Sequence, residues 1–196
     1  MLVVGIDPAS DGSACIMRDQ NVLTSIAWSK KIRTKNKVKY KIYLCNVSIL
    51  GDDETQHFQC KSGPDIGAQI GAYLTMLKHD DDEPFLIACE DAYIGRNKNT
   101  GLVVAKFAGM VVGAVHCFSR AQQSVLWVKP NVWRSKVIQL KAGTKREQCK
   151  AASLKFIPMK AQTTIEHLDK LGQLDHITDA IGVALYGLQQ HQAQTL

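Results

Sequence analysis

The first 18 residues constrain the fold most, because they combine an apolar run, an acidic residue and a turn. Residues 2–6 are apolar and rich in β-branched side chains, which predicts a short buried strand that ends at Asp7. Residues 8–12 contain Pro and Gly and have the composition of a tight turn, so residues 13–18 are expected to return antiparallel. An unpaired buried carboxylate is costly. Asp7 therefore either caps the turn through its own side chain or belongs to a functional site.

A second acidic residue follows a second apolar run. Residues 84–89, PFLIAC, predict a central strand, and Glu90 and Asp91 come directly after it. If this strand lies parallel to the first one, their carboxyl ends bring the acids together at one edge of the sheet. Side chains alternate along a strand, so at most one of Glu90 and Asp91 is expected to join Asp7.

The other elements follow from periodicity and punctuation. Helical spacing of apolar residues and short bounded apolar runs predict helices over residues 63–79, 100–118 and 174–190, and further strands over residues 22–28, 40–49 and 124–128. In the last helix, His176 and Asp179 are three residues apart and share a face near its amino end. This pair is either structural or is directed at the acids that end the two strands.

A strongly basic segment interrupts the predicted strands. Seven of the twelve residues from 30 to 41 are Lys or Arg. The alternation of these charges with other residues predicts an extended β-ribbon with one basic face, which suits contact with a phosphate backbone. The alternative is an edge strand whose lysines prevent aggregation. Residues 80–83 are four consecutive acids, which we interpret as a solvated connection rather than a metal site.

A second basic segment contains an aromatic residue. Trp133 and the cations that follow it, including Lys145 and Arg146, precede a predicted helix, and a helix amino end surrounded by cations suits phosphate binding. The alternative interpretation places Trp133 in the core and the cations on the surface.

Composition limits the class of protein. A chain of 196 residues is long enough for one domain with a substantial core, and its net charge of +6 favours a polyanionic partner. The six cysteines form no C-x-x-C pair or zinc pattern, which indicates reduced thiols. The sequence has no signal-peptide pattern and no uninterrupted apolar stretch of membrane-spanning length. We therefore expect a cytoplasmic protein that does not cross a membrane.

Three motifs in order resemble the RuvC family of Holliday junction resolvases, within the RNase H-like superfamily. They are GIDPAS at residues 5–10, IACED at residues 87–91 followed by Tyr93, and HITDAIGVAL at residues 176–185. The resemblance extends from residue 1 to about residue 190. Three features depart from the family pattern: Ala9 stands where Gly is commoner, His176 replaces a fourth carboxylate, and the basic insertion around residues 30–61 is long.

The resemblance implies a fold, a site and an activity. The implied fold is an α/β RNase H-like fold, with a mixed five-stranded sheet, an antiparallel first hairpin and flanking helices, in a single domain over residues 1–196. The implied activity is cleavage of four-way DNA junctions by paired nicks in a homodimer packed through the long helix at residues 100–118. The implied catalytic and metal-binding set is Asp7, Glu90, His176 and Asp179, holding two Mg²⁺ or Mn²⁺ ions. The expected DNA contacts are Tyr93, Arg96, Lys98, Trp133, Lys145, Arg146, Lys35, Lys37 and Lys39.

Other functions remain as alternatives at this point. A broader nuclease could act on flaps, forks or RNA hybrids, and a non-catalytic module could bind junctions only. The second alternative conflicts with the retained acids, since binding to a polyanion disfavours them. Actin-like ATPases also begin with an acid in a hairpin, but they need a second domain and a second phosphate-binding glycine motif.

Overall fold

The structure is a computed structural model that describes residues 1–49, 55–80, 83–91, 98–119, 125–140, 144, 148 and 174–194. The strands are β1 (Leu2–Asp7), β2 (Gly12–Arg18), β3 (Asn21–Lys35), β4 (Val38–Ile49), β5 (Thr55–Cys60), β6 (Phe85–Glu90) and β7 (Val125–Val128). The helices are α1 (Gly63–Leu77), α2 (Lys98–Ser119), α3 (Pro130–Lys136) and α6 (Leu174–Gln194).

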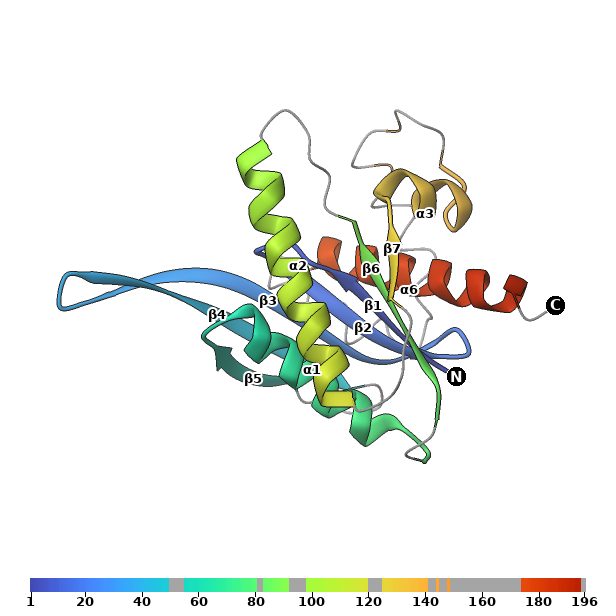
Figure 1. Cartoon of the computed structure of the whole chain (residues 1–196), viewed down its shortest axis with the longest axis horizontal. Coiled ribbons are helices and arrows are strands. Elements are labelled where there is room, and N and C mark those ends of the chain that lie inside the picture. The colour runs from blue at the N-terminus through green and yellow to red at the C-terminus, as the bar shows by residue number, and fades with distance from the viewer. Residues whose placement is uncertain are drawn as a thin grey trace.

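The strands form one mixed sheet in the order β5-β4-β3-β2-β1-β6-β7 (Figure 1). Neighbours from β5 to β1 are antiparallel, whereas β6 is parallel to both β1 and β7. The predicted fold class and first hairpin are confirmed, but the count of five strands is wrong, because the sheet has seven. The basic insertion lengthens β3 and supplies β4 and β5, which extend the sheet at one edge.

Helices cover both faces of the sheet, as the alternation of side chains along β1 requires. Leu2, Val4 and Ile6 pack in the same cluster as residues of α1 and α2, while Val3 packs with α6 on the other face. At Gly5 the backbone of α6 comes so close that an added Cβ would overlap the Ala180 carbonyl. This close approach brings the amino end of α6 to the carboxyl end of β1.

Helix α2 is both a core helix and an exposed apolar one. Phe107, Val111 and Val115 are buried in the cluster that it forms with α1 and the sheet. The stretch Asn99–Phe118 has a mean hydropathy of 1.8 and is long and apolar enough, by length and composition alone, to cross a membrane. The apolar residues on its inner side are explained by this packing, and its outer side is considered below.

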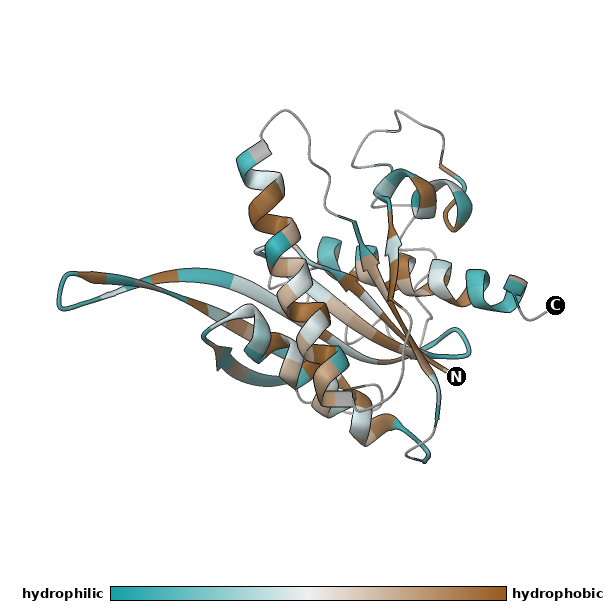
Figure 2. Cartoon of the chain, viewed as in Figure 1, coloured by the Kyte–Doolittle hydropathy of each residue, from teal (hydrophilic) through white to brown (hydrophobic). Residues whose placement is uncertain are grey.

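Strands β3 and β4 continue past the rest of the sheet as a two-stranded arm, residues 31–42 (Figure 1). Asn36 and Lys37 form its turn with positive φ values of 50° and 63°, the conformation that matches the twist of a two-residue hairpin. The arm is mostly hydrophilic, with separate apolar residues along it (Figure 2).

The prediction of one basic face on this ribbon is wrong. Lys35 lies opposite Val38 and Thr34 lies opposite Lys39, so odd-numbered residues of β3 share a face with even-numbered residues of β4. Within the arm, the two-residue turn therefore directs the cations of β3 to one face and those of β4 to the other, since the former are Lys31, Arg33 and Lys35 and the latter are Lys39 and Lys41.

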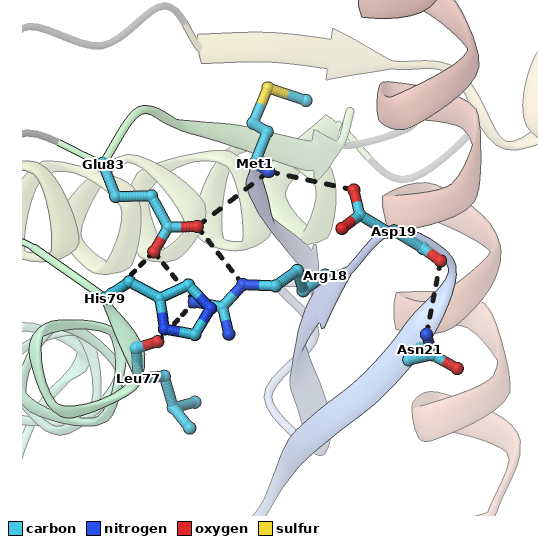
Figure 3. A network of polar contacts seen from close by, with 7 residues as sticks. All are labelled: Met1, Arg18, Asp19, Asn21, Leu77, His79 and Glu83. Atoms are coloured by element: carbon cyan, nitrogen blue, oxygen red, sulfur yellow. Dashed lines mark hydrogen bonds and ion pairs between the residues drawn. The ribbon is translucent and has the colours of Figure 1, made fainter.

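The amino end of the sheet is held by an ion-pair network (Figure 3). Arg18 donates from Nη2 to Glu83 Oε2 at 2.8 Å and to the Leu77 carbonyl at 2.7 Å. The His79 backbone N–H also donates to Glu83, and the amino group of Met1 lies 3.9 Å from its Oε1. The prediction of a solvated acidic connection is therefore wrong for Glu83, whose side chain is only 10% exposed because it joins β2, α1 and the start of β6. Asp81 and Asp82 lie outside the described residues.

Candidate functional site

Two acids stand side by side where the parallel strands β1 and β6 have their carboxyl ends, here called the carboxyl edge of the sheet. Strands β1 and β6 are parallel with Ile6 opposite Cys89, so the next residue of each strand is Asp7 and Glu90 respectively. Asp7 is 7% exposed. The predicted parallel pairing of the two acid-bearing strands is confirmed.

The first turns of α6 supply the other two members of the predicted set. His176 Nδ1 lies 2.7 Å from Asp7 Oδ2, and Ser13 Oγ donates to the His176 carbonyl at 2.6 Å. Asp179, one turn later, is close enough to raise the pKa of both His176 and Glu90 electrostatically. The four predicted side chains therefore come together from β1, β6 and α6.

Helix α3 brings two residues to this set. Trp133 Nε1 donates to Glu90 Oε2 at 2.8 Å, and Arg134 Nη2 donates to Asp179 Oδ2 at 3.0 Å. Trp133 is fully buried, so its prediction as a DNA-stacking residue is wrong: the indole ring fills the core and its N–H holds Glu90. The ion-pairing role of Arg134 was not predicted from the sequence, where it is only one of several cations in a basic segment.

The described residues neutralise the acids at this edge only in part. Burial, and then the negative charge of Asp7, raise the pKa of Glu90 to about 7 even though the Trp133 N–H favours its ionised form. Burial likewise raises the pKa of Asp179 to about 6 against the effect of Arg134. The hydrogen bond to Asp7 raises the pKa of His176. A cluster of this kind takes up protons or a cation.

The donor set suits a hard divalent cation. Each of the three carboxylates gives one oxygen to His176, Trp133 or Arg134, and its other oxygen has no hydrogen-bond partner in the part of the chain that the structure describes. Oxygen ligands are those that Mg²⁺ and Mn²⁺ prefer. As they stand, no three His, Cys, Asp or Glu side chains among the described residues are grouped tightly enough to hold a metal ion. A metal ion would therefore bind here only if the carboxylate oxygens without a hydrogen-bond partner turned toward a common point.

The loop between β1 and β2 connects this site to the arm. Asp11 Oδ1 accepts a hydrogen bond from the Lys30 backbone N–H at 2.9 Å, and Trp28 Nε1 donates to the Ala9 carbonyl at 3.0 Å. Asp11 also raises the pKa of His176 electrostatically. Its position was not predicted, although an acid within four residues of Asp7 is a visible signal in the sequence.

The predicted DNA-binding residues lie in different places. Lys35, Lys37 and Lys39 are exposed on the arm. Lys98 begins α2, but its side chain lies outside the described part of the structure. Tyr93, Arg96, Lys145 and Arg146 lie wholly outside the described residues.

Of the comparisons with known proteins, the one with solved structures found a match. No protein-family model matches the sequence, and no curated protein does. Among solved structures, the fold is similar to that of T. thermophilus RuvC in complex with a Holliday junction substrate, with a TM-score of 0.51 and 13% sequence identity. The match covers 100% of this chain and 97% of that one. At this identity the similarity establishes a RuvC-like fold.

Proposed function

We propose that this protein is a divalent-metal-dependent endonuclease that resolves four-way DNA junctions by paired nicks. The observation that carries the proposal is the convergence of Asp7, Glu90 and Asp179, with His176, at the carboxyl edge of a RuvC-like sheet. Support also comes from the structural neighbour, which was solved with a Holliday junction substrate.

The residues have separable tasks in this proposal. Asp7 faces His176 and acts electrostatically on both Glu90 and Asp179, so these three carboxylates would together hold the cations. Bound cations supply an activated water and stabilise the charge of the leaving oxygen. Trp133 and Arg134 orient the two outer carboxylates by occupying one oxygen of each.

His176 positions Asp7 and handles a proton. Its Nδ1 faces Asp7 Oδ2, so Nδ1–H donates to the carboxylate and Nε2 remains to hold or release a proton. If Nε2 instead ligates the cation, His176 is a softer ligand than a carboxylate, and Mn²⁺ should then be favoured over Mg²⁺ compared with a His176→Asp variant.

The outer side of α2 supports a homodimer with two sites. Leu102, Val103, Met110 and Phe118 are 46–63% exposed, and an added Cβ at Gly109 or Gly113 would meet nothing within 4 Å. Exposed apolar side chains beside open glycines suit close contact with a second copy of α2. We expect Met110→Asp to convert the dimer to a monomer, as measured by sedimentation equilibrium. An unchanged dimer would place the interface elsewhere.

The activity is tested with end-labelled DNA. A four-way junction is incubated beside a fork, a flap and a linear duplex, with Mg²⁺ and then with Mn²⁺, and Asp7→Asn is the matched control. We expect paired symmetric nicks near the branch point that are absent from the control. Cutting of flaps alone, or tight junction binding with no cutting in either metal, would contradict the proposal.

A further inference from the structure

The arm, residues 31–42, is a strongly charged surface outside the acidic site. Residues 31–39 are all exposed, and no Asp or Glu occurs between Asp19 and Asp52 in the sequence. The cations of the arm therefore have no acidic partner on their own strands.

Both faces of the arm carry cations and an apolar side chain. One face holds Ile32, Lys39 and Lys41, because Ile32 lies opposite Lys41 and Thr34 lies opposite Lys39. The other face holds Lys31, Arg33, Lys35 and Val38. Ile32 and Val38 are 64% and 65% exposed. A ribbon that lay flat on a phosphate backbone would need cations on one face only.

The arm projects from the same end of the sheet as the acidic site. Trp28 lies opposite Gly12, at the level where β1 ends, and β3 continues beyond that point. Asp11 and Ala9, in the loop that follows Asp7, bind Lys30 and Trp28 at the base of the arm. The five residue pairs from Lys31–Ile42 to Lys35–Val38 and the turn reach roughly 20 Å, about six base-pair steps.

We propose that the arm enters the major groove of one duplex arm of the DNA, a few base pairs from the cutting site. This rests on the proposed function for the identity of the DNA. The major groove admits a two-stranded β-ribbon and is bordered by a phosphate backbone on each side, which explains cations on both faces. Within the groove, Ile32 and Val38 contact the apolar edges of bases such as the thymine methyl group.

The test is the salt dependence of DNA binding. In a protein carrying Asp7→Asn to prevent cutting, R33Q/K35Q removes two of the three cations on one face of the arm, and K39Q/K41Q removes both cations on the other. The charge-conserving variants R33K/K35R and K39R/K41R are the matched controls. Binding is measured with a linear duplex and with a four-way junction over a range of salt concentrations.

Each neutralising variant is expected to weaken binding to both DNAs and to reduce the salt slope by about 2, that is, by about 1 for each cation removed. The controls are expected to keep the slope of the parent. An effect from one face only, an effect confined to the junction, or no effect from either face would each overturn insertion into the groove of a single duplex.

Failure of the proposed activity is distinguishable from failure of this inference. If the unmodified protein cuts no branched DNA while both neutralising variants weaken duplex binding, the arm proposal stands and the nuclease proposal falls. If junctions are cut and neither variant changes duplex binding, the nuclease proposal stands and the arm proposal falls.

Discussion

Two glutamates stand at opposite ends of the same strand, and their surroundings differ. Glu83 precedes β6 and Glu90 ends it. Burial pushes the pKa of Glu83 upward, but hydrogen bonds from Arg18 and the His79 N–H hold it below its ordinary value. Burial and Asp7 instead raise the pKa of Glu90 to about 7, and the single N–H of Trp133 does not offset them.

This difference in surroundings indicates two roles. The charges at the amino end stabilise the fold, and we propose that those at the carboxyl end serve the reaction. At the amino end of the sheet, Arg18 and the amino group of Met1 surround one acid. At the carboxyl end, among the described residues, Asp7, Glu90 and Asp179 share one close cation, Arg134, and the imidazole of His176. Uncompensated ionisable groups gather at functional sites, because the missing charge is supplied by a ligand.

The largest effect is expected from removing the charge at the carboxyl end. Glu90→Gln should lower junction cleavage about a thousandfold, since a lost metal ligand removes several kcal/mol of transition-state stabilisation. Its melting temperature without metal should stay equal or rise, because repulsion from Asp7 is relieved. Cleavage rates and thermal melts of the same preparation measure both results, and retained cleavage would contradict the assignment.

The matched change at the amino end should have the opposite result. Glu83→Gln weakens hydrogen bonds from Arg18 and His79, and it should lower the free energy of unfolding by about 2 kcal/mol. Cleavage at a temperature where the variant is folded should be unchanged. Urea denaturation measures the stability, and a large loss of cleavage by the folded variant would show that the two ends are not separate.

Trp133→Phe is expected to have a smaller effect. It keeps an aromatic ring in the core and removes the N–H that holds Glu90, so cleavage should fall by about tenfold for one hydrogen bond to a charged group. Junction affinity in the Asp7→Asn background should be unchanged, because Trp133 is buried. A loss of affinity comparable to the loss of cleavage would restore Trp133 as a DNA contact.

The smallest effect concerns pH. Glu90 and Asp179 have folded-state pKa values of about 7 and about 6, above their ordinary values, so their contribution to stability is greatest below pH 4 and is lost as pH rises through 6 to 7. In EDTA, the melting temperature should therefore fall by about 2–4 °C for each kcal/mol of unfolding free energy that is lost as pH rises. The contribution of Glu83 to stability changes with pH in the opposite direction, because it is lost as pH falls through the lowered pKa of Glu83.

Variants separate the two contributions. Glu90→Gln should flatten the fall in melting temperature between pH 5 and 8, while Glu83→Gln should flatten the fall in the acid range. If Glu90→Gln left the neutral range unchanged, the acids at the carboxyl end would not be the source of the effect.

The sequence predicted the strands that carry Asp7 and Glu90 because both are short apolar runs that end at an acid. The last helix was equally clear from its apolar face, and His176 and Asp179 share its site-facing side at the predicted spacing. These features depend on local pattern and on the rule that parallel strands end at one edge.

Features that depend on tertiary contacts were missed. Strand β5 is mostly polar, TQHFQC, and forms because β4 offers a free edge. Trp133 is buried because Gly182 on α6 leaves room for its ring, since a Cβ there would overlap the indole. The distribution of cations over the two faces of the arm depends on the residue pairing set by the turn at Asn36. This pairing places the cations of the arm that belong to β3 and those that belong to β4 on opposite faces.

The most direct test of the central claim is titration of Mn²⁺ into the protein by calorimetry, with Asp7→Asn and Glu83→Gln as the matched variants. We expect the unmodified protein and Glu83→Gln to bind Mn²⁺ with equal affinity and Asp7→Asn not to bind it. Binding that survives Asp7→Asn, or that is lost in Glu83→Gln, would contradict a metal site at the carboxyl edge of the sheet.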